Sequence, residues 1–231
     1  MPVPPEPSPQ SDEPQFHPPR SAADLELAPL GLSEEIIFRC VSVGNDARQQ
    51  VDSTYFPRNY PGITMWAHTI ACLRRELVKL QAGWRIGQSG NYETVYSEER
   101  RLAIAVVAGD ANTGIKGETD PKLKRRRGPK TTQRVSLNKL FEQMALDVDF
   151  RLPTDDLPAD EACRTWFLLL HPTAEEIQVE LSLAADIGED GLVSHWIRRI
   201  LIEPIAISGA VAPVQPDEDE DDGESMVSRP A

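Results

Sequence analysis

Cysteine and long apolar runs are scarce in this chain. It has three cysteines, Cys40, Cys72 and Cys163, and no Cys-x-x-Cys pair, which argues against a disulfide framework and against a zinc cage. No apolar run approaches the roughly 18 residues that a membrane-spanning helix needs. The first residues are rich in proline and acids, unlike a secretory leader. We therefore expect a cytoplasmic protein without a membrane partner.

The familiar catalytic motifs are also missing. No Gly-x-Ser-x-Gly, Walker-type or Gly-x-Gly-x-x-Gly loop occurs, and none of the four histidines lies in a recognisable triad context. The sequence therefore assigns no catalytic residue, no cofactor and no metal ligand. An enzyme is therefore the less favoured class.

Negative charge is concentrated at the two ends of the sequence. The formal net charge is −13 over 231 residues. Residues 1–31 carry −4 and residues 213–231 carry −6, which leaves −3 for residues 32–212. Because exposed charges farther apart than a Debye length of about 8–10 Å are screened from one another, local clusters decide what the surface binds.

Composition divides the chain into a core and two arms. Nine of the first 30 residues are proline, so we expect residues 1–31 to form a disordered, acidic arm of polyproline character. Residues 213–231 include the block Asp217 to Asp222, whose charges repel one another, and we expect a disordered acidic tail there. The predicted domain is residues 32–212.

The core reads as an α+β fold. Apolar residues at steps of three and four predict amphipathic helices over residues 63–81 and 136–148. We expect a single, mostly antiparallel sheet with both helices on one face. Residues 102–108 are apolar on both faces and predict a central, buried strand. A glycine-rich turn follows Trp84. If the Trp84 ring is exposed, it would offer a surface on which nucleic-acid bases can stack. The predicted strands span residues 35–43, 93–96, 102–108, 165–171, 176–183 and 192–202. The last two also fit a helix, and we favour a strand for both.

The strongest functional signal is a long basic loop at residues 110–134, directly after the buried strand. It holds seven cations within 13 residues and no acid among them: Lys122, Lys124, Arg125, Arg126, Arg127, Lys130 and Arg134. Side chains at this density can contact several phosphates of DNA or RNA and release counterions. Two other interpretations remain open: the loop pairs with the chain's acidic tail or an acidic partner, or it is an inert solvated loop.

Acids in the same loop suggest a second chemistry. Asp110 follows the end of the buried strand, and Glu118 lies eight residues later, so both could offer hard oxygen ligands to Mg²⁺. A metal-dependent nuclease or hydrolase would use such a pair beside a basic groove. The favoured interpretation of Asp110 is simpler: with Asn112 and Gly114 it makes a turn through side-chain to backbone hydrogen bonds.

Short motifs give one resemblance. The strand at 102–108 is followed by Gly109-Asp110 and Thr113-Gly114, and Gly128-Pro129-Lys130-Thr131 later precedes a helix that contains Asn138 and Phe141. Over residues 83–205 this combination resembles uncharacterised bacterial proteins associated with phages and other mobile elements. The resemblance implies a role around DNA and assigns no activity or catalytic residue.

Three hypotheses follow. The first is a non-catalytic nucleic-acid-associated or regulatory binding protein whose seven loop cations contact phosphates. The second is the metal-dependent enzyme with Asp110 and Glu118 at the metal. The third is an interaction protein whose acidic tail mimics a polyanion and occupies a basic protein partner.

Overall fold

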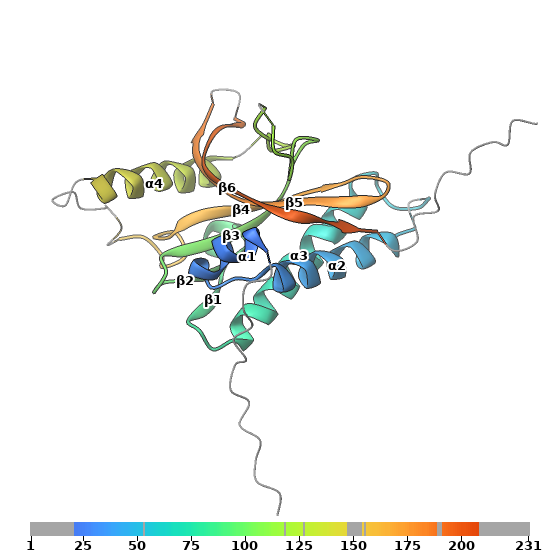
Figure 1. Ribbon diagram of the computed structural model, residues 1–231, viewed down its shortest axis with the longest axis horizontal. Helices are drawn as coiled ribbons and strands as arrows, with labels where there is room; N and C mark the ends of the chain where they lie inside the picture. Colours follow the sequence, from blue (N-terminus) through green and yellow to red (C-terminus); the bar gives the residue numbers. More distant parts are fainter. Residues whose placement is uncertain are drawn as a thin grey trace, which may run out of the picture.

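The computed structural model describes residues 21–207, except 53, 118, 127, 147–153, 155 and 189–190 (Figure 1). Its helices and strands follow in the order α1 (Ala22–Leu27), α2 (Glu34–Gln49), α3 (Tyr60–Lys79), β1 (Trp84–Gly87), β2 (Thr94–Ser97), β3 (Leu102–Ala108), α4 (Pro129–Leu146), β4 (Arg164–Pro172), β5 (Glu176–Ile187) and β6 (Val193–Ala206). Short 3₁₀ turns cover Ala28–Leu30 and Ser89–Asn91. No helix in these described ranges is long and apolar enough to cross a membrane.

One six-stranded sheet organises the molecule, and its strands lie in chain order from β1 to β6. Neighbours pair antiparallel except β3 and β4, which are parallel over Leu102↔Arg164 to Ala108↔Leu170. Parallel neighbours need a crossover connection, and α4 with its flanking loops supplies it. The prediction of a single, mostly antiparallel sheet in an α+β fold is confirmed.

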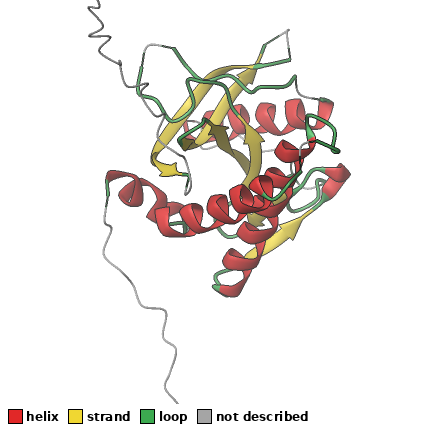
Figure 2. Cartoon of the chain, turned by 90° about the vertical axis from the view of Figure 1, so that its right-hand side faces the viewer, coloured by secondary structure: helices red, strands yellow, loops and turns green. Residues whose placement is uncertain are grey.

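Helices cover both faces of this sheet. Ile104 and Val106 of β3 pack into a core shared with α1, α2 and α3. Their neighbours Ala105 and Val107 pack into a second core on the other face, together with Val135 of α4. In Figure 1, α4 lies above the sheet and α2 and α3 lie below it, and Figure 2 shows helices on either side of the strands. The expectation that both predicted helices share a face is wrong, because central strands that are apolar on both sides need cover on both.

The helix at residues 34–49 is the largest departure from the sequence prediction, which placed a strand at 35–43. Ser33 caps α2 by accepting a hydrogen bond from the backbone N–H of Ile36 at 3.3 Å. Ile37, Cys40 and Val41 then bury one helical face. The other predicted strands coincide with β2 to β6 and the helix at 63–81 with α3. The helix predicted at 136–148 coincides with α4 as far as Leu146, and its last two residues lie outside the described residues.

Close packing of α2 on α3 depends on Gly44. A Cβ at this position would lie 2.0 Å from Thr69 Oγ1 and 2.8 Å from the carbonyl oxygen of Met65. Only glycine therefore lets the two helices approach this closely.

The folded region begins earlier than the predicted boundary at residue 32. Ala23 and Leu27 of α1 are buried in the core below the sheet, and Ser21 caps α1. Residues 1–20 of the predicted N-terminal arm lie outside the described residues, as does the predicted acidic tail at 213–231.

Candidate nucleic-acid interface

Four of the seven predicted loop cations form an exposed group. Lys122, Lys124, Arg125 and Arg126, here called the basic segment, are all exposed. None of the four makes an ion pair with a residue in the described ranges. Ten other Lys and Arg side chains do form ion pairs there. The basic segment is therefore a local concentration of positive charge that no described carboxylate neutralises.

The base of the basic segment is attached to the sheet. Leu123 is 1% exposed, packs into the core beneath α4 and forms an isolated β-bridge with Gly109. The backbone N–H of Lys124 donates to the carbonyl of Ala108 at 3.0 Å, and that of Asp110 donates to the carbonyl of Lys122 at 3.0 Å. These bonds pair residues 122–124 with the backbone just past the end of β3. The backbone at the start of the basic segment is therefore held in place.

A buried carboxylate holds the loop that leads to the basic segment. Glu180 of β5 is fully buried and accepts from Arg199 of β6, with Nη2 2.6 Å from Oε2 and Nε 3.2 Å from Oε1. It also accepts from Ser182 Oγ at 2.7 Å and from the backbone N–H of Gly114 at 2.8 Å. Four donors thus satisfy a carboxylate that would otherwise be costly to bury.

Arg199 of β6 holds the same loop through further contacts. Its Nη2 donates to the carbonyl of Ile115 at 3.1 Å, and its Nη1 lies 3.3 Å from Asp120 Oδ1. Trp196, also on β6, donates through Nε1 to the carbonyl of Pro121 at 3.0 Å. Residues 114–115 and 120–121 are therefore fastened to β5 and β6 immediately before the basic segment.

Two of the remaining predicted cations have other partners. Lys130, in the first turn of α4, is half-exposed and lies 3.0 Å from Glu161 Oε1. Arg134 is only 1% exposed, so its predicted role in phosphate contact is wrong: α4 begins at Pro129 and turns this side chain into the protein. Arg127 lies outside the described residues.

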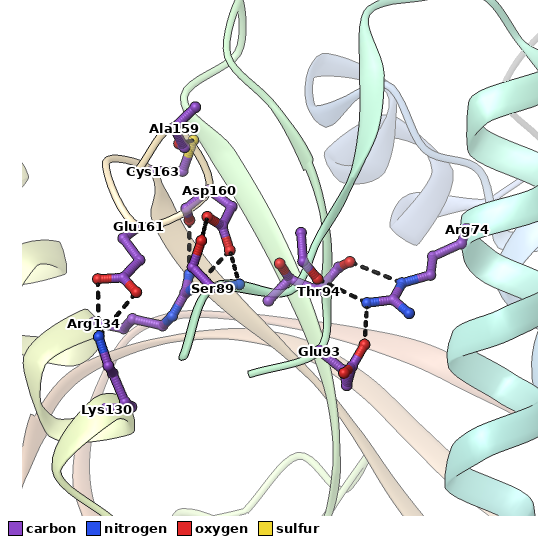
Figure 3. A network of polar contacts seen from close by, with 11 residues as sticks. Arg74, Ser89, Glu93, Thr94, Lys130, Arg134, Ala159, Asp160, Glu161 and Cys163 are labelled. Carbon is purple, nitrogen blue, oxygen red and sulfur yellow. Dashed lines mark hydrogen bonds and ion pairs between the residues drawn. The ribbon is translucent and has the colours of Figure 1, made fainter. Parts of the chain in front are cut away.

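Arg134 belongs to a buried polar network (Figure 3). Its Nη1 donates to the carbonyl of Asp160 at 2.7 Å, and its Nη2 lies 2.9 Å from Asp160 Oδ2. Ser89 Oγ donates to Asp160 Oδ1 at 2.5 Å, and the guanidinium stacks 4.8 Å from the ring centre of Tyr92. Burial alone would raise the pKa of the Asp160 carboxyl, but the hydrogen bonds from Ser89 and Arg134 outweigh it and lower that pKa. The network joins α4 to the loop before β4 and to the β1–β2 connection.

A second arginine fixes the same connection to α3, as Figure 3 also shows. Arg74 donates to the carbonyl of Gly87 at 2.7 Å and to that of Thr94 at 3.0 Å, and it pairs with Glu93 at 2.5 Å. Trp84, at the start of β1, is 4% exposed. The exposure that a stacking surface at Trp84 would need is therefore absent, because the ring packs in the core below the sheet.

Of the two predicted magnesium ligands, the structure describes Asp110 alone. Asp110 Oδ1 accepts from the backbone N–H of Asn112 at 3.0 Å, and its carbonyl accepts from the N–H of Thr113 at 3.1 Å. This is the turn that the sequence favoured. Glu118 lies outside the described residues, and within them no three His, Cys, Asp or Glu side chains group as metal ligands do.

Two hollows on the described surface hold no assembled nucleophile. The larger, of about 440 Å³, lies between α4 and the β5–β6 hairpin, where His195 stands opposite Asp186 in the β register. The His195 side chain makes no hydrogen bond to a residue in the described ranges. A smaller hollow of about 180 Å³ is lined in part by Cys163, and burial raises the pKa of this thiol to about 12. The thiol is therefore protonated at neutral pH.

Sequence reasoning missed the Glu180–Arg199 and Arg134–Asp160 pairs as structural elements. The available signal was a charge within an otherwise apolar strand, as at Glu180. It identifies a residue that needs a partner, but it does not say which partner.

The fold and site define a class: an α+β domain with a mixed sheet, helices on both faces and an anchored cationic loop beyond the central strand. Comparison with protein-family models, with curated proteins and with solved structures gives no match.

Proposed function

We propose that the protein binds nucleic acid without catalysis, through phosphate contacts from the basic segment. The observation that carries this proposal is the set of four exposed cations without ion-pair partners in the described chain, on a backbone that Leu123 anchors to the sheet. Free Lys and Arg side chains bind phosphate oxygens and displace condensed counterions, whereas cations already paired with carboxylates contribute less.

The start of α4 supports the same surface. The carbonyl of Gly128 accepts from the N–H groups of Thr131 and Thr132, so the helix begins immediately after the basic segment. The partial positive charge of a helix N-terminus adds to that of neighbouring cations and favours an anion. Lys130 pairs with the nearly buried Glu161 and is expected to contribute less than the four free cations.

The expected binding mode is electrostatic. Contacts to phosphate position a protein on nucleic acid but carry no sequence information, so we expect affinity that falls with salt and depends little on sequence. The cytoplasmic location and the link to phages and mobile elements stay predictions of the sequence, and both are compatible with this role.

The test is fluorescence anisotropy with labelled single- and double-stranded DNA and RNA at 50–200 mM salt, which spans about the range where such binding changes most. The full chain is compared with a variant that carries Lys122→Gln, Lys124→Gln, Arg125→Gln and Arg126→Gln. Four phosphate contacts predict that affinity for duplex DNA falls about 100-fold across this range, and the variant should lose most of that dependence.

A matched control removes the same charge elsewhere: Arg58→Gln, Lys79→Gln, Arg85→Gln and Arg101→Gln, all exposed. This control should bind nearly as well as the native chain. Equal weakening in both variants would show that only net charge matters, and unchanged binding in the first variant would refute the assignment. A further full-length variant with Asp217 to Asp222 changed to their amides should bind more tightly if the tail competes with phosphates.

A further inference from the structure

The apolar stripe of α3 extends beyond the cover of the sheet. Ile63, Trp66, Ile70, Leu73 and Leu77 follow one another at steps of three and four residues, which places them along one side of the helix. The last three are at most 3% exposed, but Trp66 is 38% exposed and Ile63 is 41% exposed. The first two turns of α3 therefore present an apolar surface that no described element covers.

Aromatic residues of the α2–α3 connection enlarge this surface. Phe56 stacks on Tyr60 with ring centres 4.3 Å apart and ring planes at 8°, and both remain partly exposed. Tyr55 is 85% exposed. We call Tyr55, Phe56, Tyr60, Ile63 and Trp66 the aromatic ridge. Five of the large apolar side chains that the described chain exposes lie within these 12 residues, and such a concentration is typical of a binding surface.

We propose that the aromatic ridge binds the proline-rich arm of the same chain, residues 1–13. Prolines at positions 2, 4, 5, 7 and 9 favour a polyproline II conformation. This helix has three residues per turn, so Pro2 and Pro5 share one side, as do Pro4 and Pro7. Grooves lined by aromatic side chains bind such segments, because the preformed helix loses little conformational entropy when it docks.

The arm is long enough to reach the ridge. Ser21, the first described residue, hydrogen-bonds Glu34 at the start of α2. Gly44 of α2 packs against Met65 and Thr69 of α3, so the ridge lies level with residues 44–49 of α2. At 1.5 Å per residue, this level is about 15–22 Å along α2 from Glu34. Residues 14–20 in a polyproline conformation span about 22 Å, which leaves residues 1–13 free to lie on the ridge.

Charge agrees with this assignment. Arg58, within the ridge sequence, is exposed and makes no ion pair with a residue in the described ranges. The arm offers the carboxylates of Glu6, Asp12 and Glu13. A cation beside a proline-binding aromatic surface fixes the direction of a charged ligand as well as its affinity.

The test is hydroxyl-radical footprinting of the full chain, which reads the solvent access of Tyr55 and Trp66. It is compared with a full-length variant in which the prolines at 2, 4, 5, 7 and 9 are changed to Ser. With an effective concentration of about 1 mM and an intrinsic Kd of about 0.3 mM, the arm is docked about three quarters of the time. Oxidation of Tyr55 and Trp66 should then be about fourfold slower in the native chain.

Two matched controls separate docking from general effects. Pro14→Ser with Pro18→Ser and Pro19→Ser alters only the spanning part and should leave the footprint unchanged. From the ridge side, Tyr60→Ala with Trp66→Ala should accelerate proteolysis of the arm in the full chain. Val78→Ala with Leu80→Ala, at the other end of the same helix, should not, although both residues are exposed.

Equal oxidation of Tyr55 and Trp66 in the native chain and in the five-proline variant would overturn the proposal. Protection that rises with protein concentration, together with a dimer in sedimentation that Trp66→Ala abolishes, would also overturn it. That result would assign the ridge to a second copy of the chain.

Discussion

Replacing Arg134 with methionine tests the buried polar network that joins α4 to the loop before β4. Arg134 and Asp160 are 1% and 5% exposed at their side chains, and two hydrogen bonds of 2.7 and 2.9 Å join them. Removing one partner of a buried pair typically destabilises a protein by about 3–5 kcal/mol, because the other charge stays buried without compensation. Since Ser89 still donates to the Asp160 carboxylate, we expect the lower end, about 3 kcal/mol.

Urea unfolding at pH 7 measures this change. With an m-value of about 2 kcal/mol/M, a loss of 3 kcal/mol lowers the unfolding midpoint by about 1.5 M. Arg164→Met is the matched control. Arg164 is 40% exposed and lies 3.6 Å from Glu142, so its loss should be worth about 0–1 kcal/mol. Midpoints of the two variants within about 0.3 M of each other would refute the reasoning.

The pH dependence gives an independent reading of the same pair. Because the pKa of Asp160 is lower in the folded protein than its ordinary value of 3.8, the carboxylate stabilises the fold fully above that value. This contribution is lost as the pH falls through the lower, folded-state pKa. Arg134→Met removes part of the cause, so between pH 6 and pH 3 the variant should lose less stability than the native chain. If the native chain and the variant lose the same stability between pH 6 and pH 3, Arg134 does not lower the pKa of Asp160.

Two further substitutions test the packing and the loop. Gly44→Ala places a Cβ 2.0 Å from Thr69 Oγ1 and should destabilise the protein by about 1–3 kcal/mol in urea unfolding, with part of the loss recovered by Thr69→Ala; no loss would mean that α2 and α3 separate easily. Glu180→Gln removes the charge that Arg199 binds and should accelerate hydrogen exchange of the Gly114 amide, which donates to Glu180. Unchanged exchange at Gly114 would show that the Glu180–Arg199 pair does not hold the loop.

Local pattern was sufficient for much of the fold. The period of apolar residues identified α3, and the two-sided apolar run at 102–108 identified the central strand β3. Local pattern failed at α2, because the run Ile36-Ile37-Phe38 has high strand propensity. There the partner decides: α3 offers a helical surface that Ile37, Cys40 and Val41 cover only from a helix.

The candidate interface was likewise predicted only in part from the sequence. The sequence showed that positive charge gathers between residues 122 and 134, because the cations are consecutive or nearly so. It did not show that Arg134 is buried while Arg125 is exposed. That difference depends on Asp160, which is 26 residues away in the chain and meets Arg134 only when α4 packs on the sheet.

By itself, then, the sequence determined the order of most strands, the two long amphipathic stripes and the place of the basic loop, since each depends on residues that are close in the chain. The tertiary structure alone decided that α4 crosses to the opposite face of the sheet from α3, and which loop cations stay free. It also decided that the described elements leave the aromatic ridge, on α3 and the α2–α3 connection, exposed. These features depend on contacts between distant segments, and burial and charge pairing exist only where such segments meet.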